Sequence, residues 1–288
     1  MIEFPKTPYC PALFRPAAAV KDRERAMDYR EPMETAIRLA EKAGEIIRDK
    51  FGSPFEKGYK SCPADLVTEV DRHCEEIITG GLLQAYPNHV VIGEEYGGSV
   101  EAPESGCTWY VDPLDGTTNF VYGIPFFCVS IGLAVAGEMK AGVVYDPLRR
   151  ECFQALSGSG VFLNGRPVRV DSNRKSLKEG LLVTGYPSDS RFNERLSRIN
   201  YHRVVESCAN LRALGAAALE LAYVAGGRLT GFWENTLRPW DVAAGSLLVT
   251  EAGGCVTDID GGALSLAGYP SIVASNGYIH GELLGVLG

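Results

Sequence analysis

This sequence has few positively charged residues relative to its acidic ones. Its 288 residues contain 28 Lys and Arg against 36 Asp and Glu, which gives a formal net charge of −8. Proteins that bind nucleic acid hold its phosphate backbone through a surplus of Lys and Arg. We therefore expect no nucleic-acid partner, although an acidic protein can still bind phosphate where metal ions reverse the local charge.

Closely spaced cysteine and histidine ligands are also missing. The eight Cys include no C-x-x-C pair and the four His form no cluster, so a zinc site of the usual kind is not expected. Cys128 and Cys208 fall in apolar segments, where Cys packs as a small hydrophobic residue. This use of Cys predicts unpaired thiols and a reducing, cytoplasmic location.

No apolar run is suited to a membrane. The stretches Phe120–Gly137 and Gly261–Gly281 carry no Asp, Glu, Lys or Arg, but Gly, Pro and Ser interrupt both of them. The chain begins with Glu3 and Pro5 and shows no apolar core of signal-peptide length. We therefore expect neither a membrane-spanning helix nor a secretory leader, and no membrane partner.

The order of the expected elements predicts an α+β fold. Helical spacing of apolar residues comes first, at Ile37, Ala40 and Ile47, and short strands such as Trp109–Val111 follow. Helices and strands alternate toward the C-terminus, where Leu211–Val224 is expected to form one continuous helix. The organisation that we expect is an N-terminal extension at residues 1–26, which need not be ordered, and a single domain at 27–288 with halves of about 27–172 and 173–288.

Acidic residues gather where buried strands are expected to end. The segment Trp109–Phe120 reads Trp-Tyr-Val-Asp-Pro-Leu-Asp-Gly-Thr-Thr-Asn-Phe, so an apolar strand leads directly into Asp112 and Asp115. Aspartates beside buried strands are costly unless they are paired or bind a metal ion. Gly116 and Thr117 then begin a helix, whose free N–H groups favour an anion. Carboxylates for Mg²⁺ and N–H groups for phosphate together predict a metal-assisted phosphate site.

The alternative is an Asx turn, in which Asp115 caps the helix and Asp112 lies at the surface. Three more acidic clusters beside expected strands or helices favour the metal site: Asp65 to Asp71, Glu94-Glu95, and Asp241. Asp65 itself is expected to cap the second helix. Glu95 is expected either to bind a metal ion or to orient a water molecule or Lys60.

These segments resemble the signatures of the inositol monophosphatase family. The resemblance is carried by Asp112-Pro-Leu-Asp-Gly-Thr-Thr118, by Gly93-Glu94-Glu95, by Trp240-Asp-Val-Ala-Ala-Gly245 and by the segment from Lys60 to Asp71. It extends from about residue 33 to the C-terminus. The resemblance implies a layered αβαβα fold shared with fructose bisphosphatases, a homodimer, and lithium-sensitive, Mg²⁺-dependent hydrolysis of a small phosphorylated polyol or sugar.

The resemblance also implies roles for single residues. Thr117, hydrogen-bonded toward Asp71, would orient and help deprotonate a water molecule that attacks phosphate, and Glu94 would take part in catalysis. The site would hold two or three Mg²⁺ ions, for which Mn²⁺ can substitute. Glu94, Asp112 and the Leu114 carbonyl would bind one ion, and Asp112, Asp115 and Asp241 a second. The substrate-binding residues would be Glu94, Leu114, Asp115, Gly116, Thr117, Gly215, Ala216, Ala217, Glu234 and Asp241.

The choice of substrate stays open among several phosphate esters. Inositol 1-phosphate leads, and fructose 1,6-bisphosphate, histidinol phosphate and nucleotide 3′-phosphates could undergo the same chemistry. Thr118 counts against the nucleotide branch, which usually has Lys at this position. Glu234 is expected to pair with substrate hydroxyls, and Arg238 to be a surface or interface residue rather than the partner of a second phosphate. A regulatory protein-binding role is the alternative from a different functional class.

Overall fold

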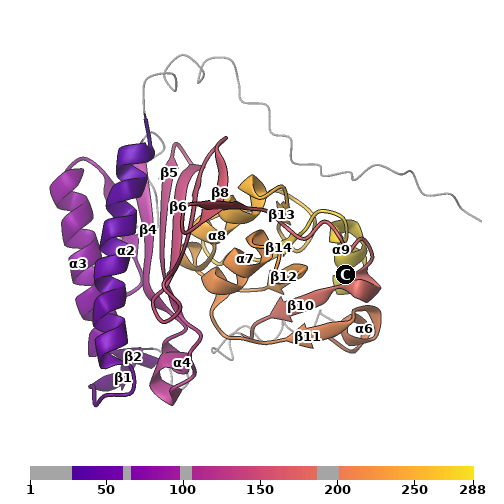
Figure 1. The fold of residues 1–288 in the computed structure, drawn as a ribbon, viewed down its shortest axis with the longest axis horizontal. Coiled ribbons are helices and arrows are strands. Elements are labelled where there is room, and N and C mark those ends of the chain that lie inside the picture. Colours follow the sequence, from indigo (N-terminus) through magenta and orange to yellow (C-terminus); the bar gives the residue numbers. More distant parts are fainter. Residues whose placement is uncertain (1–27, 61–65, 98–105, 187–200) are drawn as a thin grey trace, which may run out of the picture.

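The computed structural model describes residues 28–60, 66–97, 106–186 and 201–288. Within these ranges, a seven-stranded sheet and a five-stranded sheet lie side by side, with helices between them and on their outer faces (Figure 1). The expected extension at residues 1–26 and the expected helix cap Asp65 fall outside the described residues. The boundary expected near residue 172 falls in the connection between the two sheets, residues 169–180.

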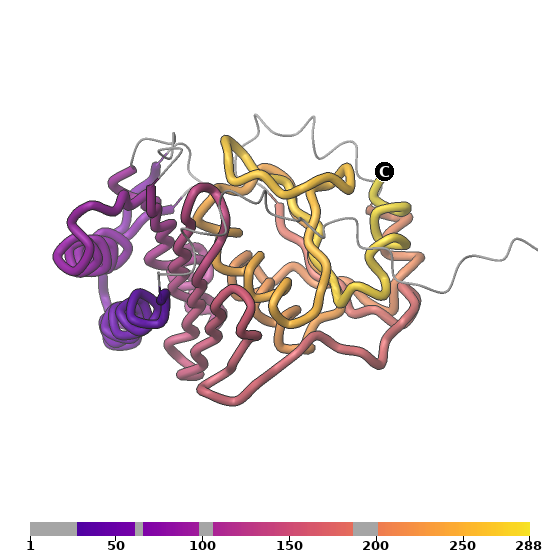
Figure 2. The backbone as a smooth tube through the Cα atoms, turned by 90° about the horizontal axis from the view of Figure 1, so that it is seen from above, coloured from indigo at the N-terminus to yellow at the C-terminus, as the bar shows by residue number. Residues whose placement is uncertain are grey.

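Two helices cover the outer face of the seven-stranded sheet (Figure 2). The helix α2 (Arg30–Lys50) buries Ala36, Ala40 and Ile47, which follow helical spacing and pack against the sheet. Its neighbour α3 (Glu69–Ala85) follows a short hairpin of β1 (Lys57–Tyr59) and β2 (Leu66–Thr68).

A capping box begins α3. The side chain of Thr68 accepts hydrogen bonds from the N–H groups of Val70 and Asp71, and the Asp71 carboxylate accepts one from the Thr68 N–H. Thr68 therefore caps this helix, and the cap fixes the position of the buried carboxylate of Asp71.

The seven-stranded sheet has the order β3-β4-β5-β6-β7-β8-β9. Its first pair, β3 and β4, is parallel, and every other neighbouring pair is antiparallel. The short helix α4 (Thr117–Tyr122) follows β4 directly. The strands are β3 (Val90–Gly93), β4 (Cys107–Asp115), β5 (Cys128–Val135), β6 (Glu138–Asp146), β7 (Glu151–Leu156), β8 (Gly160–Leu163) and β9 (Arg166–Val168).

The five-stranded sheet has the order β11-β10-β12-β14-β13, and its β10 runs parallel to both of its neighbours. A 3₁₀ turn at Leu177–Glu179 leads into it. Its strands are β10 (Leu181–Thr184), β11 (Asn210–Arg212), β12 (Gly231–Glu234), β13 (Cys255–Thr257) and β14 (Ile272–Ser275).

The helix expected over Leu211–Val224 is wrong in its first part. Leu211 lies in β11, where it pairs with Leu182 of β10, and the helix α7 covers only Ala217–Ala225. Gly215 between them has φ of +82°, in the left-handed region, so the backbone turns there and cannot continue as a right-handed helix. Strand pairing with a distant partner and one turn residue therefore outweigh the local apolar pattern.

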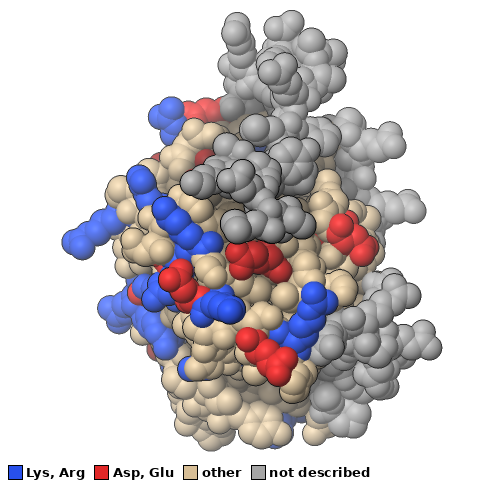
Figure 3. Space-filling model, turned by 90° about the vertical axis from the view of Figure 1, so that its right-hand side faces the viewer, with Lys and Arg blue, Asp and Glu red and all other residues tan. Residues whose placement is uncertain are grey.

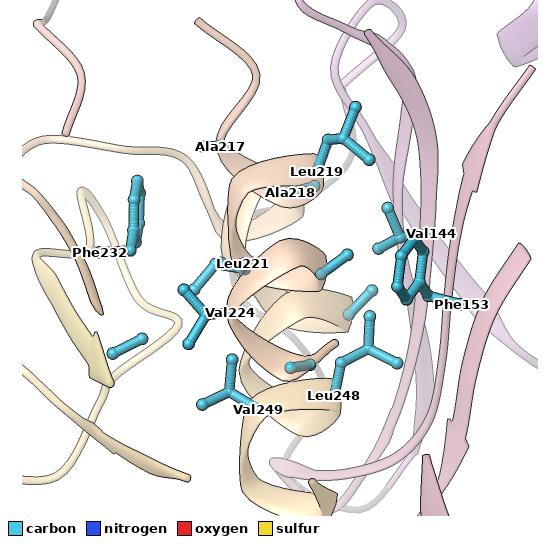
Figure 4. Packing of buried hydrophobic residues seen from close by; sticks show 14 of the residues in the cluster. Val144, Phe153, Ala217, Ala218, Leu219, Leu221, Val224, Phe232, Leu248 and Val249 are labelled. Atoms are coloured by element: carbon cyan, nitrogen blue, oxygen red, sulfur yellow. The ribbon is translucent and has the colours of Figure 1, made fainter. Parts of the chain in front are cut away.

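The two sheets pack on a shared pair of helices. Between them lie α7 and α8 (Pro239–Glu251), and Figure 4 shows Leu221 and Val224 of α7 directed toward Phe232, while Val144 and Phe153 lie on the opposite side. Both helices are buried on nearly all sides, which explains their almost continuous apolar sequence. With α6 (Tyr201–Ser207) and α9 (His280–Leu287) packed in one apolar cluster with the second sheet, the layers confirm the expected αβαβα fold.

No helix among the described residues is both long and apolar enough to cross a membrane. On the face seen in Figure 3, Lys and Arg side chains are interspersed with Asp and Glu.

Candidate active site

One pocket of about 220 Å³ lies where the elements that join the two sheets meet. The end of β4 and the start of α4 form one wall, and the starts of α7 and α8 and the end of β12 form the other. Asp71 does not line the pocket, but it lies behind Thr117 and accepts its hydrogen bond. All other predicted site residues line the pocket: Glu94, Asp112, Leu114, Asp115, Gly116, Thr117, Gly215, Ala216, Ala217, Glu234 and Asp241.

Negative charge accumulates around Asp112. This side chain is only 2% exposed, and its Oδ1 accepts the N–H of Leu114 at 3.0 Å. Burial, followed by the charges of Glu94, Asp115 and Asp241, raises the pKa of Asp112 well above its ordinary value. Burial and the charge of Glu94 raise the pKa of Asp241 in the same way. Carboxylates from three elements therefore repel one another in this pocket, and a bound cation would relieve that repulsion.

Asp115 connects the two walls of the pocket. Its carboxylate accepts the N–H groups of Ala217 at 3.2 Å and Ala218 at 2.8 Å, and a longer one from Leu219 at 3.4 Å. The backbone of α7 thus begins against a side chain from β4, which favours negative charge at that point. Burial nevertheless raises the pKa of Asp115 to about 6, since it outweighs these hydrogen bonds. The Asx-turn alternative is wrong, because Asp115 accepts the N–H groups at the start of α7 rather than of α4 and Asp112 is buried.

The hydroxyl of Thr117 has two acceptors. It lies 2.7 Å from Oδ1 of Asp71 and 3.0 Å from the carbonyl oxygen of Leu114. Asp71 is fully buried, and burial raises its pKa although Thr68 and Thr117 donate hydrogen bonds to it. The expected contact between Thr117 and Asp71 is therefore present, and it places a basic carboxylate against the hydroxyl of a residue that lines the pocket.

Lys60 holds the two neighbouring glutamates that follow β3. Its ammonium lies 2.7 Å from Oε1 of Glu94 and also forms an ion pair with Glu95. Burial opposes the charged ammonium, but the two carboxylates together raise the pKa of Lys60. Burial raises the pKa of Glu95 to about 7, because the pairing with Lys60 offsets only part of the desolvation. Of the two roles expected for Glu95, the structure contains the contact with Lys60.

Glu234 ends β12 with a carboxylate directed into the pocket. Burial, followed by the charges of Glu220 and Asp241, raises its pKa well above the ordinary value. Gly185, at the end of the parallel neighbour β10, makes room for it, because a Cβ at Gly185 would lie 2.2 Å from Oε2 of Glu234. The ends of two parallel strands therefore build this part of the pocket.

Several lining residues were not predicted from the sequence, namely Leu66, Thr118, Gly185, Tyr186 and Leu237. The signal that could have found Gly185 and Tyr186 is their position directly after the buried strand β10. Arg238 is not among the lining residues. Its guanidinium lies 4.3 Å from the ring centroid of Tyr269, as expected for a surface arginine that stacks on an aromatic ring.

The donor set suits a hard divalent cation. The pocket offers carboxylate oxygens from Glu94, Asp112, Asp115 and Asp241 and the backbone of Leu114, and oxygen donors are those that Mg²⁺ and Mn²⁺ prefer. Within the described part of the chain, no group of three or more Asp, Glu, His or Cys side chains is already arranged to hold a metal ion. The residues fit such a cation through their chemistry and through the raised pKa values of Asp112 and Asp241.

Comparison with known proteins gives a consistent result. Residues 28–287 match the inositol monophosphatase family. A protein of Pseudomonas aeruginosa named Nus factor SuhB is 48% identical over 235 residues, which cover 78% of this chain and 84% of the relative. An inositol-1-monophosphatase of Rhizobium meliloti is 43% identical over 241 residues, which cover 83% and 89% of the two chains.

Solved structures share the fold. The crystal structure of the extragenic suppressor protein suhB from Bartonella henselae superposes with a TM-score of 0.82 at 40% identity. The superposition covers 89% of this chain and 98% of that protein.

Proposed function

Because this chain belongs to the inositol monophosphatase family, we propose that it is a metal-dependent phosphatase whose substrate is inositol 1-phosphate. The observation that carries the proposal is one pocket lined both by Glu94, Asp112, Asp115 and Asp241 and by the Gly116–Thr117 turn. Carboxylates attract cations, and the backbone N–H groups that begin a helix attract an anion. A phosphate ester brought together with divalent cations satisfies both requirements.

We assign two metal positions as the family resemblance implies. Glu94, Asp112 and the Leu114 carbonyl would hold one Mg²⁺, and Asp112, Asp115 and Asp241 a second, with Mn²⁺ as a substitute; all of these residues line the pocket. The resemblance implies two or three ions in all. When bound, such ions stabilise negative charge on the phosphate oxygens and make water more acidic.

Thr117 and Asp71 would supply the proton path. Since Thr117 donates its hydroxyl proton to Asp71, its oxygen can accept a hydrogen bond from a water molecule in the pocket. As that water attacks phosphorus, its proton passes to Thr117, and the Thr117 proton passes to Asp71. The bond between phosphorus and the leaving alcohol oxygen breaks, and that oxygen takes up a proton from solvent. The N–H groups of Gly116 and Thr117 would hold the phosphate oxygens during the transfer.

Glu234 would select the alcohol part of the substrate. Its carboxylate lies on the wall formed by α7 and β12, across from the Gly116–Thr117 turn, and can pair with the hydroxyl groups of a cyclic polyol. Fructose 1,6-bisphosphate and histidinol phosphate are weaker candidates. No cation from Arg238 lines the pocket to receive a second phosphate, and the carboxylate of Glu234, on the wall proposed to receive the alcohol, disfavours further negative charge there.

A protein-binding role is the second candidate function. The observation in its favour is the name Nus factor SuhB of the relative from Pseudomonas aeruginosa. Such a role would not need the carboxylates of the pocket, so Asp112→Asn should leave it intact while abolishing hydrolysis. We also propose that the chain acts in the cytoplasm as a homodimer, as the family resemblance implies.

A panel of phosphate esters tests the proposed activity. The purified chain with Mg²⁺ is assayed for phosphate release from inositol 1-phosphate, fructose 1,6-bisphosphate, histidinol phosphate and a nucleotide 3′-phosphate. We expect the highest kcat/KM with inositol 1-phosphate. No release from any ester under these conditions would favour the protein-binding role instead.

A further inference from the structure

A buried amide outside the pocket connects its two walls. Asn119 belongs to α4, which follows the β4 carboxylates, and it is 7% exposed. Its Nδ2 donates to the carbonyl oxygen of Phe126 at 2.8 Å and to that of Leu214 at 2.7 Å, with the carbonyl of Gly215 farther away at 3.4 Å. The first acceptor belongs to the same half of the chain as Asn119, and the other two belong to the turn before α7.

This turn is held on its other side by Glu220. The N–H groups of Leu214 and Gly215 donate to Oε1 of Glu220 at 2.9 and 3.0 Å. The carbonyls of the turn are therefore fixed by α4, and its amides by the first turn of α7. The backbone N–H and C=O groups of Leu214 and Gly215 are thus paired with buried side chains, which leaves the turn little freedom to move.

The position of the turn matters because it forms part of the pocket. A Cβ added to Gly116 would lie 3.1 Å from the Cβ of Ala216 and 3.2 Å from the carbonyl oxygen of Gly215, so the two walls touch here. A shift of the turn would change the width of the pocket between the Gly116–Thr117 turn and the residues before α7. Asn119 does not itself line the pocket.

We propose that Asn119 is a positioning residue that fixes the Leu214–Gly215 turn against α4 and so sets the width of the pocket for its substrate. The proposal rests on the proposed phosphatase activity where it concerns substrate. Hydrolysis of an ester whose alcohol contacts both walls should depend on the hydrogen bonds from Asn119 to this turn. Hydrolysis of an ester without hydroxyls on the alcohol, such as p-nitrophenyl phosphate, should depend on them much less.

The experiment compares Asn119→Ala and Asn119→Asp with Asn276→Ala. Asn276 is a matched control, because it is 1% exposed and its Nδ2 also donates to two carbonyls, those of Asp171 at 2.9 Å and Arg174 at 2.7 Å, and none of these residues lines the pocket. Asn119→Asp keeps the shape but places a carboxylate oxygen against carbonyl oxygens, so it tests the donor rather than the volume.

Three measurements are made on each full-length variant: kcat and KM for both esters with Mg²⁺, thermal unfolding, and hydrogen exchange of the amides around 214–219 without metal or substrate. For Asn119→Ala we expect KM for inositol 1-phosphate to rise about tenfold, and that for p-nitrophenyl phosphate to stay within about threefold. Exchange of these amides should accelerate, and Asn119→Asp should show at least the same losses. Asn276→Ala should lower the unfolding temperature and leave both KM values and this exchange unchanged.

Two kinds of result would overturn the proposal. If hydrogen exchange of the amides at 214–219 is unchanged in Asn119→Ala, Asn119 does not fix the turn, and this conclusion holds whether or not the protein is active. Equal increases in KM for both esters, or a lower unfolding temperature with both KM values unchanged as expected for Asn276→Ala, would reduce Asn119 to a contributor to stability. If the wild type hydrolyses neither ester but amide exchange still accelerates in Asn119→Ala, the phosphatase proposal fails, while the role of Asn119 in fixing the turn is supported.

Discussion

Thr117 donates its hydroxyl hydrogen bond to Oδ1 of Asp71 at 2.7 Å, and this contact joins the start of α4 to the first turn of α3. Thr117 is the member of this pair that lines the pocket, and the raised pKa of the buried Asp71 makes its carboxylate a better proton acceptor. The pair therefore forms a two-step path along which a proton can leave the attacking water.

This pair gives the first prediction. Thr117→Val keeps the branched shape and removes the hydroxyl, so kcat should fall by about 100-fold or more. Thr117→Ser keeps the hydroxyl and should retain most of the activity. The test is to measure kcat of both variants by steady-state kinetics at saturating Mg²⁺. Equal activity in the Val and Ser variants would show that the hydroxyl takes no part in the reaction.

Metal dependence is the second prediction. An all-oxygen donor set should support turnover with Mg²⁺ or Mn²⁺, whereas Ca²⁺ should bind without supporting it, because it is larger and accepts irregular geometry. By resemblance to the family, Li⁺ should inhibit. Phosphate release is measured after chelation and after adding back each ion. Full activity in excess chelator would exclude a metal-dependent reaction.

Glu234 is the subject of the third prediction. Glu234→Gln keeps the shape but replaces an acceptor oxygen by a donor, so inositol 1-phosphate should lose about 1–3 kcal/mol of transition-state binding. Gly185→Ala should act similarly, because its Cβ would collide with the Glu234 carboxylate. Hydrolysis of p-nitrophenyl phosphate should change little in both variants.

The ratio of the two kcat/KM values within one variant is the measurement, since errors in enzyme concentration cancel. Equal losses for both esters would mean that Glu234 supports the metal site through its neighbour Asp241. No loss for either ester would remove the polyol assignment.

Acid stability provides the fourth prediction, away from the pocket. His280 is buried between Thr257, whose Oγ1 lies 3.0 Å from Nε2, and Ser275, whose Oγ lies 3.0 Å from Nδ1. Thr257 donates its own proton to the Asp258 carbonyl, so Nε2 of His280 must be the donor and Nδ1 the acceptor. This arrangement suits the neutral ring, and burial lowers the pKa of His280 to about 4.

The sign of the effect follows from the lowered pKa. Above the ordinary value of 6.5, neither state of the protein protonates His280, and its full contribution to stability is present. Between pH 6.5 and 4 only the unfolded state takes up this proton, so unfolding becomes easier by up to about 3 kcal/mol. Denaturant unfolding should show that His280→Gln lacks this part of the acid dependence. The exposed His202 is the control. If the free energy of unfolding fell between pH 6.5 and 4 as steeply in His280→Gln as in His202→Gln, the prediction would be contradicted.

The site residues that are easiest to predict from the sequence are those that lie together in one short segment. Asp112, Asp115, Gly116 and Thr117 stand close together at the end of one apolar strand, so their proximity did not depend on the rest of the fold. Glu94, Asp241 and Glu234 are far apart in the chain. Glu94 and Asp241 stood out as acidic residues beside expected strands or helices, and the resemblance to a family assigned all three to one site. The structure places all of these side chains on the same pocket.

What could not be predicted depends on contacts between distant segments. Leu211 has the apolar character of a helix residue, but pairing with Leu182 and the left-handed turn at Gly215 make it part of a strand. Asn119 belongs to the strongest motif of the sequence, yet its partners lie 95 and 96 residues away, at Leu214 and Gly215. Gly185 matters only because Glu234 lies beside it, and nothing in the local sequence indicates that neighbour.

The most direct test of the account compares phosphate release from inositol 1-phosphate by the wild-type chain and by Asp112→Asn at saturating Mg²⁺. Burial and the charges of Glu94, Asp115 and Asp241 raise the pKa of Asp112, and it is the residue proposed to hold both metal ions. The variant should be folded and at least as resistant to thermal unfolding in chelator as the wild type, because one repelling charge is gone. The account predicts Mg²⁺-dependent release by the wild type and a rate below about a tenth of it in the variant. A folded variant that retains more than about a tenth of the wild-type rate, or a wild type that releases no phosphate, would contradict it.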